Sequence, residues 1–176
     1  VYEEHIESAR TDQLTGYRNK TYLSHLLPQL LEHGELTPTE RTFSFFLVEG
    51  HDLGSINEKY GRPAGDLMIQ ELGKRIEKLL QQRRNETLGG WGDYLIRYQG
   101  AQFLIILHSV DSKRANIFAQ RLRQVTESQE WPCGIGKWSV SVGISSFPED
   151  TVNSEEILMN VETALSYARG QSDRNK

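Results

Sequence analysis

The residues best placed to do chemistry surround a tight turn at Gln99-Gly100. Apolar runs at Leu95-Ile96 and 103–107 flank this turn, so the pattern predicts a β-hairpin. A hairpin tip displays backbone N–H groups and the next side chains at the edge of a sheet, where a phosphate or a metal ion can bind. The side chains displayed there are those of Ala101 and Gln102, and neither carries a charge. The tip therefore lacks the carboxylates that hold a hard divalent cation.

Composition limits the class of protein. The chain has 176 residues, 37% of them hydrophobic and 25% charged, as expected for one globular domain. Its net charge of −4 argues against a nucleic-acid partner. The single cysteine, Cys133, is typical of a reducing compartment, and no apolar run reaches membrane-spanning length. We therefore expect a cytoplasmic domain with no membrane segment in this piece. Because the chain begins at Val1, we expect it to be part of a longer protein.

Patterns of helices and strands alternate along the chain. The predicted helices cover 20–33, 63–82, 112–128 and a last segment N-capped by Ser154, and the predicted strands cover 42–49, both arms of the hairpin and 137–147. Pro28 predicts a kink or an early end in the first of these helices. Strands interleaved with helices indicate an α/β or α+β layered sheet.

Several separate motifs follow one another in an informative order. They are Asp12-Gln13-Leu14-Thr15-Gly16, 57–61 with 64–66, Ser141-Val142-Gly143-Ile144, and Ala164-Leu165 with Ala168-Arg169. In this order the chain resembles the GGDEF domain, the diguanylate cyclase family, over roughly residues 10–170. The resemblance implies a ferredoxin-like palm of nucleotide-cyclase type, with a mixed central sheet flanked by helices. It also implies the end of a signalling helix over 1–10, the GGDEF domain over 11–172 and a tail or linker over 173–176.

The catalytic loop is where this chain departs from the family's pattern, so the chain resembles a degenerate member. The family's five signature positions correspond to Gln99, Gly100, Ala101, Gln102 and Phe103, of which only the second glycine and the phenylalanine are kept. Members of the family join two GTP molecules with the help of two divalent cations held by carboxylates. Glu49 is the one charged metal ligand left, and Gly54 stands where a triphosphate-binding lysine is expected. We therefore expect no catalysis, no required cofactor, a Glu49 position without bound cation, and only weak binding of Mg²⁺ together with GTP.

The positions that recognise guanine are better retained. Asn57 and Asp66 correspond to the family's base-reading residues, and Arg169 to its phosphate-binding lysine. An Asp that accepts from the N1–H and the exocyclic amine of guanine, with an Asn amide on the opposite edge, forms a coherent purine reader. The alternatives are structural, because Asn57 and Asp66 also suit helix caps and Arg169 suits a helix C-terminus.

A second site, at which many members of the family bind their own product as an inhibitor, is retained in part. Asp93 matches the Asp of that site and Arg121 a secondary arginine, but Gly90 stands where the main arginine is expected. Without that guanidinium the dinucleotide loses its bidentate partner, so we expect no high-affinity product binding.

Three functions remain open at this level. The first is a catalytically inactive regulatory module of bacterial cyclic-di-GMP signalling that senses GTP or another guanine nucleotide. The second is a ligand-free module for dimerisation or protein interaction, and the third is a weak residual diguanylate cyclase. The resemblance implies, as partners, an adjacent sensor domain and a phosphodiesterase domain of the same chain, and a second copy in a homodimer.

Overall fold

The computed structural model describes residues 1–31, 42–86 and 93–174. At its centre is a four-stranded sheet in the order β2-β3-β1-β4. The strands are β1 (Phe43–Gly50), β2 (Tyr94–Gln99), β3 (Gln102–His108) and β4 (Val140–Phe147). The pairings β1–β3, β1–β4 and β2–β3 are all antiparallel, so these strands do not form the mixed sheet that was predicted. The reason is the strand order: β1 and β2 run in the same direction, but β3 lies between them.

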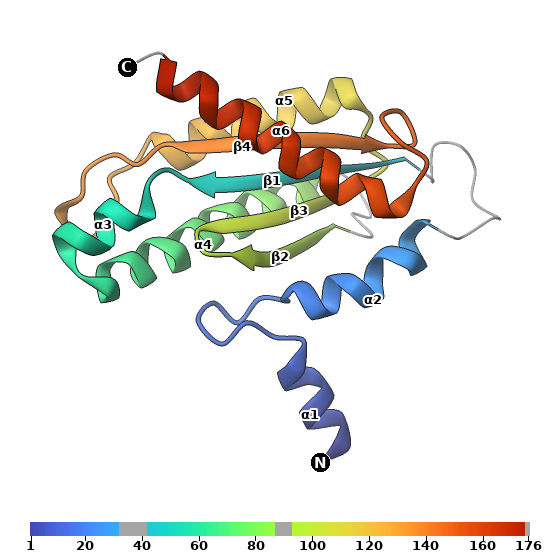
Figure 1. Ribbon diagram of the computed structural model, residues 1–176, viewed down its shortest axis with the longest axis horizontal. Coiled ribbons are helices and arrows are strands. Elements are labelled where there is room, and N and C mark those ends of the chain that lie inside the picture. Colours follow the sequence, from blue (N-terminus) through green and yellow to red (C-terminus); the bar gives the residue numbers. More distant parts are fainter. Residues whose placement is uncertain (32–41, 87–92, 175–176) are drawn as a thin grey trace.

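Helices cover both faces of the sheet, and the predicted layered palm is confirmed (Figure 1). α4 and α5 lie behind the sheet, α6 crosses in front of β4 and β1, and α2 lies beside β2. The bounds are α1 (Tyr2–Ala9), α2 (Lys20–Leu31), α3 (Leu53–Tyr60), α4 (Arg62–Glu86), α5 (Ser112–Glu127), the short 3-10 helix η1 (Pro132–Gly134) and α6 (Ser154–Arg174). None of the described helices has both the length and the apolar character that crossing a membrane requires.

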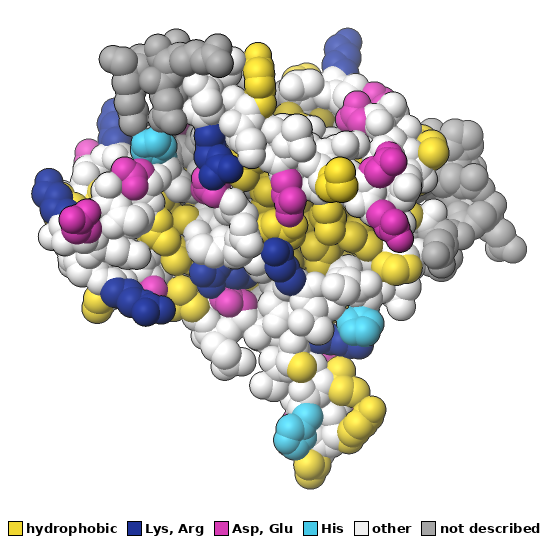
Figure 2. All heavy atoms as spheres, in the orientation of Figure 1, with side chains coloured by type: hydrophobic (Ala, Val, Ile, Leu, Met, Phe, Trp, Pro, Cys, Tyr) yellow, Lys and Arg dark blue, Asp and Glu magenta, His cyan; other side chains and the backbone are white. Residues whose placement is uncertain are grey.

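Each face of the sheet has its own apolar core. Because side chains alternate along a strand, Phe46 and Val48 of β1 face α4 and α5, while Phe45 and Leu47 face α6 and α2. β1 is buried on both faces, which explains its central place in the sheet. On the face with α6 and α2, hydrophobic side chains gather between the two helices (Figure 2). This layered core fixes the ends of β1 and β3, where the candidate site lies.

Two local predictions need correction. Ser154 is the first residue of α6, and the capping side chain is that of Asn153, whose Oδ1 accepts from the Glu155 backbone N–H at 2.9 Å. The two residue types are comparable caps, so the sequence alone did not distinguish the adjacent positions. α2 continues past Pro28 to Leu31, so the proline causes no early end to the helix. In addition, α3 was not predicted; it has only eight residues, of which Ile56 is buried.

Candidate functional site: the hairpin tip and an adjoining polar pocket

The hairpin tip is closed by its own residues. Gly100 has a φ of 47°, in the left-handed region that suits glycine. The Arg97 Nε donates to the Gly100 carbonyl oxygen at 2.9 Å. Ala101 is 5% exposed and packs in the core beside α4, and Gln102 is 7% exposed. The prediction that both side chains are displayed at the tip is therefore wrong, since one fills the core and the other forms a contact inside the protein.

That contact involves Glu49, the last charged residue of the expected metal site. Gln102 is its pairing partner across β1 and β3, and the Gln102 Nε2 donates to the Glu49 Oε2. Arg169, from α6, donates from Nη1 to the Glu49 Oε1 at 3.0 Å. The Glu49 side chain is 19% exposed and that of Arg169 is 46% exposed. Both oxygens of the carboxylate are thus engaged by donors of the chain, and its charge is balanced by a guanidinium.

A pair of divalent cations does not fit these residues. Mg²⁺ requires several hard oxygen ligands, but Ala101 has no ligand atom and Gln102 directs its amide nitrogen toward Glu49. Glu49 in turn faces the positive charge of Arg169. Over residues 1–31, 42–86 and 93–174, no group of three or more His, Cys, Asp or Glu side chains is placed to hold a metal ion. The side chains that contact Glu49 thus supply a guanidinium and an amide nitrogen, and no further carboxylate oxygen.

A polar pocket of about 770 Å³ lies on the α4 side of the hairpin. Its lining includes the predicted pair Asn57 and Asp66, together with Arg62, Arg97 and Asp12. Arg169, the third predicted residue, instead lines a cavity of about 380 Å³ on the α6 side, with Gln102 and Ser166. The structure therefore brings the two base-reading candidates together and places the phosphate-binding candidate on the other face of the sheet.

Asn57 and Asp66 are not helix caps, so that alternative is excluded. Asn57 lies inside α3 and Asp66 inside α4. The Asn57 Oδ1 is buried, and no described residue donates a hydrogen bond to it. It lies against Gly65, where a Cβ would come within 1.7 Å of it. Gly65 thus allows α3 and α4 to approach with the Asn57 amide oxygen packed between them.

The contact between Asn57 and Gly65 gives a first prediction. Gly65→Ala is expected to destabilise the chain by about 1–3 kcal/mol, because the new methyl group overlaps the Asn57 amide. In an Asn57→Ala background the same change is expected to stabilise it by about 0.5–1 kcal/mol, because alanine is the better helix former. Urea unfolding of the four proteins measures both effects. The same sign in both backgrounds would show that the two residues are not in contact.

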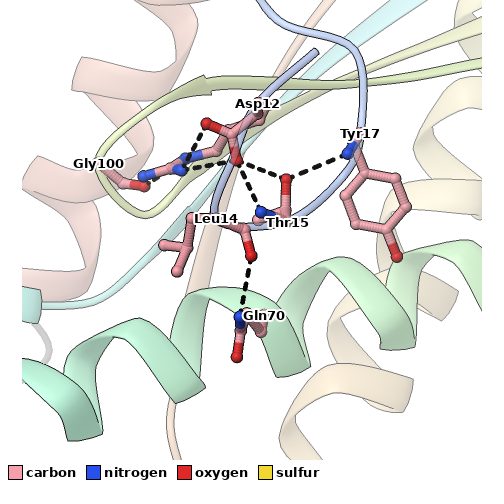
Figure 3. A network of polar contacts seen from close by, with 7 residues as sticks. Asp12, Leu14, Thr15, Tyr17, Gln70 and Gly100 are labelled. Carbon is pink, nitrogen blue, oxygen red and sulfur yellow. Dashed lines mark hydrogen bonds and ion pairs between the residues drawn. The ribbon is translucent and has the colours of Figure 1, made fainter. Parts of the chain in front are cut away.

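The segment 11–19 forms one wall of the pocket and is fixed by Asp12 (Figure 3). Both Asp12 carboxylate oxygens lie 3.1 Å from the Arg97 Nη1, and the Asp12 Oδ2 also accepts from the Thr15 N–H and hydroxyl at 2.9 and 2.6 Å. The Gln70 Nε2 donates to the Leu14 carbonyl oxygen at 2.9 Å, which ties this segment to α4. Asp12, Arg97 and Arg62 were not among the residues predicted for the site. An Asp followed by Thr three residues later was the local sign of this turn.

On the other face of the hairpin, Tyr98 is held as a neutral hydrogen-bond donor. Its hydroxyl donates to Glu162 of α6, and the Lys20 ammonium lies 4.0 Å from its ring centroid. Burial, followed by the hydrogen bond and the negative charge of Glu162, raises the pKa of Tyr98 well above its usual value. Tyr98 thus links β2 to α6 through a hydrogen bond from its uncharged hydroxyl.

The two described members of the predicted inhibitory site have other partners. The Asp93 side chain is 0% exposed and accepts from the Arg83 Nη1 at 2.6 Å. Burial raises the pKa of Asp93, and the charge of Arg83 opposes this shift. Arg121 donates to the Gln82 Oε1 at 3.4 Å. Gly90 lies outside the described residues, and product binding at this site stays a prediction.

This protein is a palm domain of nucleotide-cyclase type. Three features define this class: the strand order, the helices α3 and α4 between β1 and the hairpin, and the pocket beside the hairpin tip. The family model described as "Diguanylate cyclase, GGDEF domain" matches residues 9–176. The chain therefore belongs to the GGDEF family of diguanylate cyclases.

Two curated proteins are similar to the chain in sequence, and one solved structure is similar in fold. The chain is 28% identical to diguanylate cyclase A of Treponema denticola, over 97% of this chain and 44% of that protein. It is 27% identical to the cyclic di-GMP phosphodiesterase NbdA of Pseudomonas aeruginosa, over 96% of this chain and 20% of that protein. The coiled coil and GGDEF domain of DgcB from Caulobacter crescentus, solved in complex with c-di-GMP, superposes with a TM-score of 0.79 at 17% identity, covering 97% of this chain and 85% of that one. The chain spans less than half the length of these two curated relatives.

Proposed function

We propose that this chain is a catalytically inactive GGDEF domain that acts as a regulatory module in bacterial cyclic-di-GMP signalling and binds a guanine nucleotide. One observation carries the proposal: the Glu49 carboxylate is engaged by Gln102 and Arg169. Condensation of two GTP molecules needs metal ions to activate a hydroxyl and to neutralise phosphoryl charge. The loss of that site costs at least about three orders of magnitude in rate, since each ~1.4 kcal/mol is tenfold.

Nucleotide binding is supported by the pocket that contains Asn57 and Asp66. Charge-assisted hydrogen bonds of an Asp to a purine edge contribute about 1.5–3 kcal/mol each. Two or three such contacts without metal ions correspond to a dissociation constant on the order of 0.2 mM. At that affinity the occupancy changes most when the free nucleotide concentration is close to the dissociation constant, which suits a sensor for that range.

The regulatory role is supported by the relatives, which are longer than this chain. One of them is a cyclic di-GMP phosphodiesterase, of which the chain matches 20%. We propose the same kind of arrangement here: a sensor domain before the GGDEF domain and a phosphodiesterase domain in the same chain. The occupancy of the guanine pocket would then be transmitted to the neighbouring domain.

The proposal predicts binding without turnover. Calorimetric titration with GTP is expected to give a dissociation constant on the order of 0.2 mM, and Asp66→Asn to weaken it at least about tenfold, because one charge-assisted contact is lost. Glu58→Gln is the control, since it removes an exposed carboxylate of α3 outside the pocket lining. Cyclic-di-GMP formation with Mg²⁺ or Mn²⁺ is assayed in parallel. Turnover at the rate of an ordinary diguanylate cyclase would contradict the proposal.

A second candidate, the ligand-free interaction module, is favoured by one feature of α6. Met159 and Tyr167, two turns apart on this helix, are 66% and 70% exposed. Large exposed apolar side chains on one helix face are typical of contact surfaces. If no guanine ligand binds, and sedimentation detects a dimer that Met159→Glu dissociates, this second function replaces the first.

A further inference from the structure

We infer that the guanine pocket selects ligands with at most one phosphate, such as guanosine or GMP, over GTP when no divalent cation is present. This inference rests on the proposed function and names the ligand class of the same site. It follows from where the cationic groups around the hairpin tip are already engaged.

Two of the three arginines near the tip already have partners within the chain. Arg97 lines the pocket but is engaged on two sides, by both Asp12 oxygens and by the Gly100 carbonyl oxygen. Arg169, beyond the tip, is bound to Glu49 at 3.0 Å. Arg62 also lines the pocket, and no described residue forms a hydrogen bond or an ion pair with it. The site therefore offers one uncompensated guanidinium, which is sufficient for a single phosphate.

The turn between β1 and α3 offers no site for a further phosphate. A helix N-terminus is a general anion site, but that of α3 already has its own carboxylate. Asp52 accepts from the Ser55 N–H at 3.2 Å and from the Ser55 hydroxyl at 2.7 Å, with its backbone in the left-handed region at a φ of 49°. The next residues add no cation, since the Cβ position of Gly54 has only the Asp52 carboxylate within 4 Å. This turn therefore presents the carboxylate of Asp52, close in sequence to Glu49 near the end of β1, and adds no positive charge.

The charge balance then decides between the ligands. Among the described residues, Arg62 supplies the one unpaired guanidinium of the pocket, and the Asp66 carboxylate is left to accept from the guanine edge, so guanosine or a monophosphate needs no further cation. Each further phosphate brings negative charge toward the turn that carries the Asp52 carboxylate, while the nearby Glu49 already uses the positive charge of Arg169. Like charges that approach without a counterion repel each other. The next guanidinium, that of Arg169, lies in the cavity beyond the tip and is bound to Glu49, so only a phosphate chain long enough to pass the tip reaches it, in competition with that carboxylate.

The experiment is a calorimetric titration series with guanosine, GMP, GDP and GTP in EDTA at fixed ionic strength. In the unmodified chain the affinity is expected to fall at least about tenfold from GMP to GTP, because the added phosphates are repelled by nearby carboxylates. Glu49→Gln frees Arg169 and is expected to raise the affinity for GTP about tenfold while leaving guanosine unchanged. Glu162→Gln is the matched control, because Glu162 lines the same α6-side cavity but binds Tyr98 and not Arg169.

The possible outcomes separate the ligand class from nucleotide binding itself. If affinity rises from GMP to GTP, or if Glu49→Gln and Glu162→Gln change GTP binding equally, the ligand class is wrong while nucleotide binding stands. If none of the four ligands binds, the proposed function fails, and this inference fails with it. A decrease from GMP to GTP that Glu49→Gln alone reverses supports both.

Discussion

Arg75→Ala is expected to destabilise the chain by about 3–5 kcal/mol, the cost of removing one partner from a buried charged network. Arg75 is 7% exposed and donates to the Thr126 and Glu130 carbonyl oxygens at 2.8 Å and to the Glu71 carboxylate at 2.9 Å. Its guanidinium also lies 3.8 Å from the ring centroid of Trp131. The substitution therefore leaves the Glu130 carbonyl oxygen without this donor and removes a cation–π contact. The Thr126 carbonyl oxygen loses one of two donors, since it also accepts from the Trp131 Nε1 at 3.1 Å.

Thermal unfolding measures this effect. A loss of that size corresponds to a fall of about 10 °C in Tm for a domain of this length. Arg84→Ala is the matched control, because Arg84 is an exposed arginine of the same helix and its loss is expected to change stability by less than about 0.5 kcal/mol. Arg75→Lys keeps the charge but not the planar fork, and is expected to recover less than half of the loss. Equal stability of the Arg75→Ala and Arg84→Ala proteins would show that this network does not hold α4 to α5.

Much of the fold could be predicted from local patterns. The apolar run of β1, the period-two alternation of β4 and the three- and four-residue spacing of apolar residues in α4 are properties of the sequence itself. The hairpin was predicted because Gly100 lies between two apolar runs. α3 was missed because eight residues with one buried side chain give almost no periodic signal. Its start also depends on Asp52 in a left-handed conformation, which no apolar pattern indicates.

The candidate site was predicted only where its residues lie close together in the sequence. Asn57 and Asp66 are nine positions apart and were placed through the order of the family's motifs. The contact of Glu49 with Arg169 joins residues 120 positions apart, and that of Asp12 with Arg97 joins residues 85 apart. Such pairings are set by the packing of whole elements, since both faces of the sheet must be covered before these side chains meet. The charges could be counted from the sequence, but their partners could not be identified.

The proposed loss of the metal site predicts how acidic substitutions at the tip behave. The double variant Ala101→Asp with Gln102→Glu is expected to lose about 3 kcal/mol in EDTA, because adjacent carboxylates repel and a buried carboxylate is desolvated. Gln102 now donates to Glu49, so Gln102→Glu replaces an attraction by a repulsion. Millimolar Mg²⁺ is expected to restore about 2 kcal/mol, since a cation that binds only the folded state stabilises it by mass action. The unmodified chain is expected to show a Tm shift of less than about 1 °C on the same addition, because Arg169 already balances Glu49.

Thermal unfolding in EDTA and in Mg²⁺ is measured for the double variant and for Ala101→Asn. The comparison separates the effect of the added charge from that of the added side-chain volume. Asparagine has nearly the volume of aspartate but no charge, so it is expected to lose stability at this buried position without a response to Mg²⁺. A Mg²⁺ response in the unmodified chain equal to that of the double variant would mean that Glu49 already holds a cation. Arg169 would then have to leave the carboxylate, and the central contact of the proposed function would be lost. A response confined to the double variant shows instead that the tip lacks only negative charge, and that Arg169 stands in for the cation.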